Sequence, residues 1–394
     1  MHVNDLLKLA VEKGASDLHL KVGNYPMARL HGLLVPLFDE QKLDHETLVD
    51  MAASIMSTSQ RQKFKDSQEV DLAYSVPGLG RFRCNVFQQR GTIGVVLRVI
   101  PVNIKPLDDL GLPQVLKKIS AEERGLVLVT GTTGSGKSTT LAAMVDYINA
   151  TRTAHVITIE DPIEYLHRDN RSIINQREIG VDTRSFAFAL RSALRQDPDV
   201  ILVGEMRDME TIETALHAAE TGHLVFSTLH TLDATETINR IISVFPPHQQ
   251  KQIRLQMSAV LKAAISQRLI PTRDGLGRAP AVEVLVATPF IKDCIVDKDK
   301  THQIPGAIAQ GTSQYGMQTF DQSIFGLFQN QLISYDEALR WASNVDEFKL
   351  KVQGISTTAD ASRDQMANSV FAGPSKQKPG VKPAGPPEVT RFGK

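Results

Sequence analysis

Eight residues beginning at position 131 have the spacing of a phosphate-binding loop. Residues 131–138 are Gly-Thr-Thr-Gly-Ser-Gly-Lys-Ser, which matches the pattern G-x-x-x-x-G-K-[ST]. Glycines let backbone N–H groups curl around an anion, and the helix that follows adds the positive end of its dipole. Lys137 can reach the β- and γ-phosphates, and the Ser138 hydroxyl can bind Mg²⁺. The pattern therefore predicts a nucleoside triphosphate site.

The nucleotide site should include most of this loop and the first turn of the next helix. The residues expected to contact nucleotide are Thr133, Gly134, Ser135, Gly136, Lys137, Ser138 and Thr139. The chain has no Asn-Lys-x-Asp motif that would recognise guanine. We therefore expect ATP, with Mg²⁺ as its metal cofactor.

An acidic residue follows the apolar run Val200–Val203, in the manner of a Walker B motif. Ligands of open parallel sheets gather at the carboxyl ends of the strands. We expect Glu205, together with Ser138, to hold Mg²⁺ directly or through water. The alternative is a surface acid that caps the next helix.

Three acids follow a second apolar run, at Glu160, Asp161 and Glu164. Hydrolysis needs a group that positions or activates water opposite the γ-phosphate. The residue types leave all three open, and Asp161-Pro162 also suits a turn.

Histidines and arginines supply further candidates. His230 follows the strand expected at His223–Ser227, and it can donate to a phosphate oxygen and so sense its presence. For His223, at the beginning of that strand, a structural role is favoured. Arg81, Arg83 and Arg98 would act only if the first domain folds over the nucleotide, because arginine stabilises charge on a transferring phosphoryl group.

The surrounding pattern predicts an α/β fold for the second part of the chain. Short apolar runs alternate with amphipathic stretches from Gly125 onward, which is typical of a parallel sheet covered by helices on both faces. We also expect helices at about 249–268, 320–332 and 335–343. Before this part, alternating segments punctuated by glycines predict a smaller α+β domain, and clustered prolines at 101–113 predict a linker.

Composition limits the classes of partner and the cellular compartment that the sequence suggests. Among 394 residues, 44 Lys+Arg balance 44 Asp+Glu, so nothing favours a nucleic-acid partner. No apolar run approaches the ~18 residues of a membrane span, no signal peptide is recognisable, and the two cysteines fit free thiols in a reducing compartment. We expect a cytoplasmic protein that meets the membrane only through partners. Residues 356–394, rich in Pro, Gly and Lys, are expected to be a disordered tail.

Four segments, in order along the chain, resemble the signature motifs of the ATPases that drive type II secretion and type IV pili. These are an N-terminal signature at 15–20, an Asp box at 157–165, a Walker B motif at 200–208 and a His box at 222–231. The resemblance covers about residues 1–350. Residues 301–305 and 316–322 are similar to the pilus-retraction branch, whereas residues 290–295 keep only the apolar frame and the basic position of that branch's Ala-Ile-Arg-Asn-Leu-Ile motif.

The resemblance implies a PAS-like domain at 1–105 and a RecA-like ATPase domain at 106–355. By motif position, Glu164 would activate water and Glu205 would be the Walker B acid. Arg83 and Arg98, with the family's separation of fifteen residues, would contact phosphate, and Arg81 has weaker support.

The family also implies partners and a task. It implies a homohexameric, Mg²⁺-dependent motor that couples ATP hydrolysis to domain rotation and retracts pili. The implied partners are an inner-membrane platform protein of the PilC type and a paralogous ATPase of the PilU type. The alternatives are a PilU-like accessory subunit, a pilus-extension or secretion ATPase, and a RecA-like nucleic-acid motor, which the zero net charge disfavours.

Overall fold

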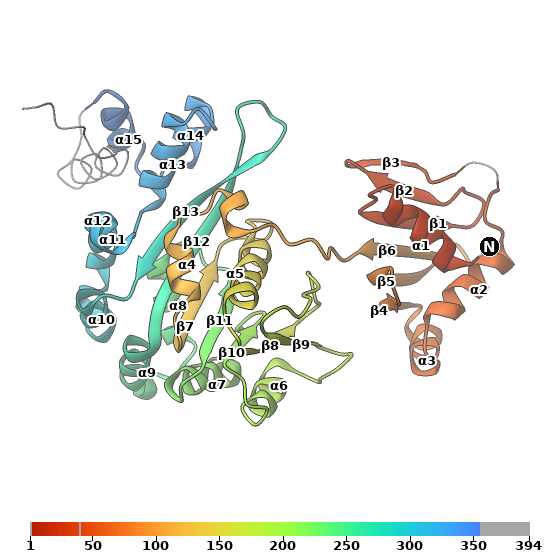
Figure 1. The fold of residues 1–394 in the computed structure, drawn as a ribbon, viewed down its shortest axis with the longest axis horizontal. Helices are drawn as coiled ribbons and strands as arrows, with labels where there is room; N and C mark the ends of the chain where they lie inside the picture. The colour runs from red at the N-terminus through yellow and green to blue at the C-terminus, as the bar shows by residue number, and fades with distance from the viewer. Residues whose placement is uncertain (1, 39–40, 355–394) are drawn as a thin grey trace, which may run out of the picture.

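The computed structural model describes residues 2–38 and 41–354 and arranges them in two domains (Figure 1). Residues 101–106, which contain no helix or strand, connect the domains. The predicted tail at 356–394 lies outside the described residues.

The N-terminal domain is an antiparallel sheet with three helices, as the alternating segments and glycine turns predict. Its elements are α1 (Val3–Glu12), β1 (Asp17–Lys21), β2 (Met27–Leu30), β3 (Leu33–Pro36), α2 (His45–Ile55), α3 (Thr58–Ser67), β4 (Glu69–Val76), β5 (Gly80–Gln89) and β6 (Thr92–Val99). The strand order is β3-β2-β1-β6-β5-β4. Alternate residues such as Leu18, Phe82 and Leu97 are completely buried, while their neighbours form a polar outer face.

The C-terminal domain, hereafter the P-loop domain, contains a seven-stranded sheet in the order β13-β12-β7-β11-β10-β8-β9. Its first elements are η1 (Leu107–Leu110), α4 (Val115–Ser120), β7 (Gly125–Thr130), α5 (Lys137–Thr151), β8 (His155–Glu160), β9 (Ile173–Glu178), α6 (Phe186–Ala193), β10 (Val200–Val203), α7 (Met209–Glu220), β11 (Leu224–Leu229) and α8 (Ala234–Ser243). The rest are α9 (Pro247–Val260), β12 (Leu261–Pro271), β13 (Arg278–Val286), α10 (Pro289–Val296), η2 (Lys298–Gln303), α11 (Ile304–Gln310), α12 (Thr312–Tyr315), α13 (Phe320–Gln329), α14 (Tyr335–Trp341) and α15 (Val345–Val352).

Helices cover both faces of this sheet, which confirms the predicted α/β class. Val127 and Val129 of β7 pack with α4 and α5, whereas Leu126 and Leu128 belong to the core beneath α6 to α9. The central strands are therefore buried on both sides, and their apolar runs are continuous for that reason. All neighbouring strands are parallel except β12 and β13, which form an antiparallel pair at one edge.

The predicted helix at 249–268 is wrong in its second half. The helix α9 ends at Val260, and Leu261–Pro271 forms β12 instead. Leu, Lys, Ala and Gln in this segment favour a helix locally, but its burial between β7 and β13 prevails over that propensity. The strand β9 was not expected, because its residues are mostly polar and only partly buried. The expected helices at 320–332 and 335–343 are present as α13 and α14.

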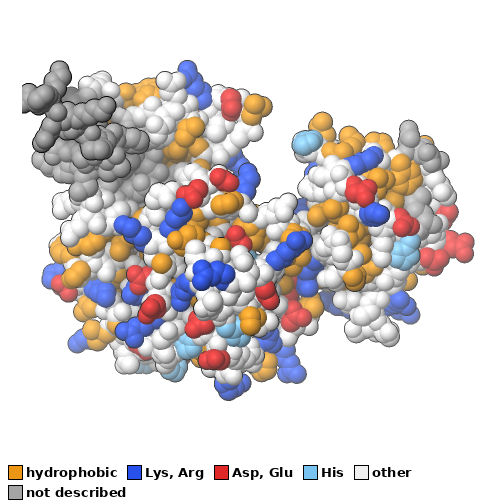
Figure 2. Space-filling model, viewed as in Figure 1, with side chains coloured by type: hydrophobic (Ala, Val, Ile, Leu, Met, Phe, Trp, Pro, Cys, Tyr) orange, Lys and Arg blue, Asp and Glu red, His pale blue; other side chains and the backbone are white. Residues whose placement is uncertain are grey.

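The surface carries mixed charge. Figure 2 shows basic and acidic side chains interspersed over the face in view. Among the residues that the structure describes, no helix has the length and apolarity needed to span a bilayer.

Candidate nucleotide site

The phosphate loop connects the end of β7 to the start of α5. Gly131 and Gly136 have φ angles of 139° and 92°, which residues with side chains rarely adopt. A Cβ atom would lie 2.4 Å from the Gln267 carbonyl oxygen at Gly131 and 2.9 Å from Gln267 Nε2 at Gly136. The loop must therefore stay without side chains at both positions, as a cradle of backbone N–H groups requires. This loop geometry fits the phosphates of a nucleoside triphosphate.

Gln267 supports the loop from β12, and its role could not be found while this segment was expected to be a helix. It is 3% exposed, and its Oε1 accepts a 2.8 Å hydrogen bond from the Thr140 hydroxyl. The Gln267 amide therefore binds the first turn of α5 and also packs against Gly136 of the loop.

Lys137 lies at the mouth of the loop, where its ammonium group donates to the carbonyl oxygens of Gly131 (2.8 Å) and Thr132 (3.0 Å). Burial lowers the pKa of Lys137, and the nearby Glu164 and Glu205 carboxylates oppose that shift. The side chain is therefore enclosed and close to the acids that the chemistry requires.

A cavity of about 520 Å³ opens beside the loop. Nine of the predicted site residues line it: Thr133, Gly134, Gly136, Lys137, Ser138, Thr139, Glu164, Glu205 and His230. Ser135 does not line it, since its hydroxyl is buried and has no hydrogen-bond partner in the described part of the chain. The structure thus brings together residues from four separate strand ends.

Sequence reasoning missed several lining residues: Tyr165, His167, Phe186, Arg207, Leu269 and Arg278. Arg207 could have been suspected from its position two residues after Glu205. Arg278 begins β13 and carries no local signal. Burial lowers the pKa of His167 to about 4, so this imidazole is neutral at pH 7.

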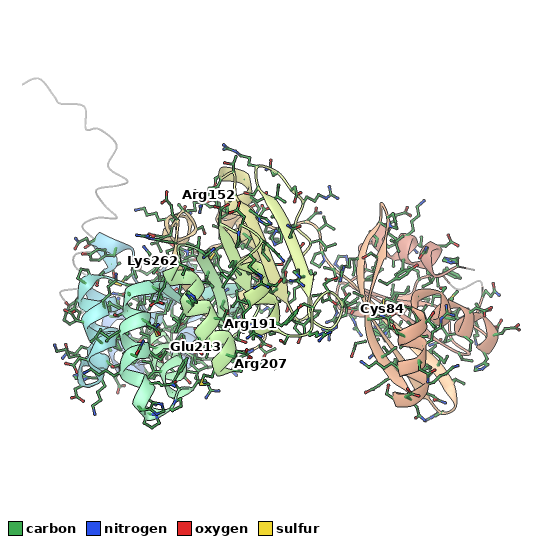
Figure 3. All side chains as sticks on the ribbon, turned by 90° about the horizontal axis from the view of Figure 1, so that it is seen from below. Cys84, Arg152, Arg191, Arg207, Glu213 and Lys262 are labelled. Carbon is green, nitrogen blue, oxygen red and sulfur yellow. The ribbon has the colours of Figure 1, made fainter. Side chains whose placement is uncertain are left out.

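The Walker B carboxylate has two nitrogen neighbours. Arg207 Nε lies 2.7 Å from Glu205 Oε2, and His230 Nε2 lies 3.7 Å from the same oxygen. Figure 3 labels Arg207 together with Arg191 of α6 and Glu213 of α7. Glu205 and His230 meet because β10 and β11 are adjacent and parallel, so their carboxyl ends coincide.

The three acids of the Asp box occupy different environments. Glu160 accepts from the Thr158 hydroxyl (2.6 Å) and from Gln176 Nε2 (3.1 Å), and its burial raises its pKa. Asp161 and Glu164 are exposed at the cavity. Among residues 2–38 and 41–354, no hydrogen bond or ion pair engages the carboxylate of Asp161 or of Glu164, so both are available to a bound water. Of the two, only Glu164 is close enough to Lys137 to affect its charge.

The arginines of the N-terminal domain lie outside the cavity. Arg83 and Arg98 face each other directly across β5 and β6 on the outer face of the sheet. Arg98 Nε donates to the buried Asp17 carboxylate at 2.8 Å. Arg81 instead forms an ion pair with Glu178 of the P-loop domain at 3.0 Å.

His223, for which a structural role was favoured, donates from Nδ1 to the Ala218 carbonyl oxygen (2.9 Å).

A glycine-lined phosphate loop after a parallel strand, with acids and a histidine at neighbouring strand ends, defines a P-loop nucleotide hydrolase. The profile of the type II/IV secretion system protein family matches residues 1–314, and the chain belongs to that family. It is accordingly an ATP hydrolase of the secretion and pilus ATPase group.

Individual relatives agree with this membership. The chain is 47% identical to the type IV pilus retraction ATPase PilT of Pseudomonas aeruginosa, over 88% of this chain and 100% of PilT. It is 42% identical to the type IV pilus ATPase PilU of the same organism, over 91% of this chain and 94% of PilU. A crystal structure of the pilus retraction motor PilT with bound ADP superposes with a TM-score of 0.81 at 47% identity, covering 88% of this chain and 98% of that one.

Proposed function

We propose that the protein is the Mg²⁺-dependent ATPase motor that retracts type IV pili. The observation that carries this proposal is the similarity to PilT, which extends over the full length of that relative and accompanies an intact set of cavity residues. The protein would act as a homohexamer in the cytoplasm. It would work at the inner face of the inner membrane against a PilC-like platform protein, with a PilU-like ATPase as a further partner.

Each cavity residue would have its own role in ATP hydrolysis. Backbone N–H groups of the loop and Lys137 would hold the β- and γ-phosphates. Ser138 and Glu205 would hold Mg²⁺, which neutralises phosphate charge when bound. Water attacks the γ-phosphorus and the bond to the β–γ bridging oxygen breaks, which yields ADP and phosphate. Glu164 would accept the proton of that water, and His230 would donate to a phosphate oxygen.

The site would be completed by a second subunit. Arg83 and Arg98 do not line the cavity of their own chain, although their charges suit a phosphate. In a ring of identical subunits each interface presents the same two surfaces, so the outer face of one N-terminal domain can serve the cavity of its neighbour. This arrangement would couple hydrolysis to domain rotation.

Purified variants test the ATP site. Lys137→Ala and Glu205→Gln should each lower ATP turnover by about 100-fold or more, since the first removes a positive charge from the reacting phosphates and the second removes a carboxylate that would hold Mg²⁺. Lys262→Ala is the matched control, because Lys262 pairs with Glu122 away from the cavity. Normal turnover in both site variants would reject the assignment.

A second candidate is a PilU-like accessory ATPase that depends on a partner motor. Residues 290–295, within α10, keep only part of the retraction-branch motif, and the identity to PilU is 42%. Deleting this gene alone in the source cell, and imaging labelled pili, distinguishes the candidates. Abundant pili that never shorten support the retraction motor. Normal shortening supports the accessory role, and an absence of pili supports an extension ATPase.

A further inference from the structure

One ion pair joins the two domains beside the nucleotide cavity. Arg81 Nη2, at the start of β5, lies 3.0 Å from Glu178 Oε2 at the end of β9, and the two side chains are 19% and 8% exposed. In Figure 1, β5 lies on the side of the N-terminal domain that faces β8 and β9. Removing one partner of so enclosed a pair leaves the other charge uncompensated.

The same carboxylate oxygen also holds the segment that carries Glu164. Glu178 Oε2 accepts a hydrogen bond from the Ile163 amide at 3.4 Å. The Glu164 side chain begins at the next residue along the chain. The position of the Glu178 carboxylate, and therefore of Arg81, bears directly on the backbone next to Glu164.

A second contact lies on the other side of Glu164. The Leu166 amide donates to the Pro101 carbonyl oxygen at 3.2 Å, and Pro101 begins the connection that leaves the N-terminal domain. The amides of Ile163 and Leu166 therefore lie on either side of Glu164. The acceptor of the first is the Glu178 carboxylate, which Arg81 of the N-terminal domain holds, and the acceptor of the second belongs to the connection between the domains.

The P-loop domain holds this segment from its opposite side. The Tyr165 hydroxyl lies 2.8 Å from Thr139 Oγ1, and the Tyr165 carbonyl oxygen accepts from Gln176 Nε2 at 2.9 Å. Thr139 is on α5, in the first turn after the phosphate loop. Residues 163–166 therefore contact both the phosphate-binding helix α5 and groups that the N-terminal domain holds in place.

We propose that Arg81 and Glu178 are positioning residues that make the placement of Glu164 depend on the position of the N-terminal domain. This inference rests on the role proposed above for Glu164. A rotation that withdraws Arg81 releases the Glu178 carboxylate and with it the Ile163 amide. Glu164 then loses the placement that turnover needs, so hydrolysis occurs only in one arrangement of the two domains.

The test uses the full-length protein with ADP bound for exchange and with Mg²⁺·ATP for turnover. In Arg81→Gln and Glu178→Gln, amide hydrogen exchange in peptides covering 163–166 should become about tenfold faster, because the Ile163 amide loses its fixed acceptor. The kcat for ATP hydrolysis should fall about tenfold with KM changed less than about twofold, since small displacements of a catalytic group reduce rate rather than binding.

Three further variants separate positioning from general damage. The exchanged pair Arg81→Glu with Glu178→Arg should recover kcat to within about threefold of the unmodified protein, because it restores the attraction between the domains. Arg81→Lys should keep both protection and turnover within about threefold, since it keeps the cation. Glu122→Gln breaks a 2.7 Å pair with Lys262 that lies away from the cavity, and should change neither quantity.

Unchanged exchange at 163–166 in both single variants would overturn the inference. Faster exchange with unchanged kcat would also overturn it, since the pair would then hold a segment that turnover does not need. Full turnover in Glu164→Gln alone would instead reject the catalytic role of Glu164, and this inference with it. The exchange data from the same preparations distinguish that result from a failure of the ion pair alone.

Discussion

Arg207 Nε lies 2.7 Å from Glu205 Oε2, so the carboxylate proposed to hold Mg²⁺ already has a cationic partner. Arg207 is 73% exposed and Glu205 is 15% exposed, so the arginine can leave while the carboxylate stays in place. Metal binding at Glu205 must compete with this pairing.

Replacing Arg207 by Gln should therefore lower the Mg²⁺ concentration that gives half-maximal turnover. The expected change is up to about fivefold, because exposed ion pairs contribute roughly 0.2–1 kcal/mol. A magnesium titration at saturating ATP measures it. Arg191→Gln, which removes the ion pair with Glu210 nearby, is the control. A higher magnesium requirement in Arg207→Gln would show that the arginine supports the metal site instead.

The three acids of the Asp box should respond differently to removal of charge. Glu164→Gln should lower kcat by about 100-fold or more with little change in KM, as expected for loss of a general base. Asp161→Asn should retain turnover within about threefold, the size of effect expected where no catalytic proton transfer is lost. Glu160→Gln should act mainly on stability, since Glu160 already binds Thr158 and Gln176. Steady-state kinetics on the three variants would refute this ranking if Asp161→Asn were the most impaired.

Mixed rings test whether arginines act between subunits. Arg83→Gln subunits keep the phosphate loop, and Lys137→Ala subunits keep the arginines, so each homomer should be inactive. Random mixing of equal amounts should restore turnover at about one quarter of the sites, because an intact loop then meets an intact arginine of a neighbour.

The control for this experiment mixes Lys137→Ala with Glu164→Gln subunits. Both defects then lie in the same cavity, so no combination restores a complete site. Recovery in this control, or none in the arginine mixture, would contradict action between subunits.

Glu283 should make stability depend on pH. Its carboxylate accepts from the Ala234 amide at 2.8 Å. Burial raises the pKa of Glu283 to about 7 from its ordinary 4.5, Asp233 and Asp321 add to the shift, and Ala234 and Arg268 oppose it. Between pH 4.5 and 7 the folded protein binds a proton that the unfolded chain has lost. The stability gained from the protonated carboxyl is therefore complete below pH 4.5 and is lost as the pH rises through 7.

Replacing Glu283 by Gln removes this dependence. The free energy of unfolding of the unmodified protein, relative to Glu283→Gln, should fall by up to about 3 kcal/mol between pH 4.5 and 8. Denaturant unfolding at fixed protein concentration measures it, with Glu122→Gln as an exposed control. Parallel pH profiles for the unmodified protein and Glu283→Gln would refute the shift.

Local spacing made much of the fold and site predictable. The phosphate loop is a run of consecutive residues, so its pattern can be recognised directly in the sequence. The apolar runs before Glu205 and His230 predict strands, and functional residues are expected at the ends of such strands. Parallel pairing then brings these ends together. The resemblance added the choice of Glu164, which residue types alone left open.

Only the tertiary structure decided the features that depend on distant partners. The segment 261–268 became a strand because burial between β7 and β13 outweighed helix propensity. That choice placed Gln267 against the phosphate loop. Arg81 and Arg83 differ by two positions on one strand, yet only Arg81 meets Glu178. The partner of Arg81 lies 97 residues further along the chain, and no local pattern encodes such a contact.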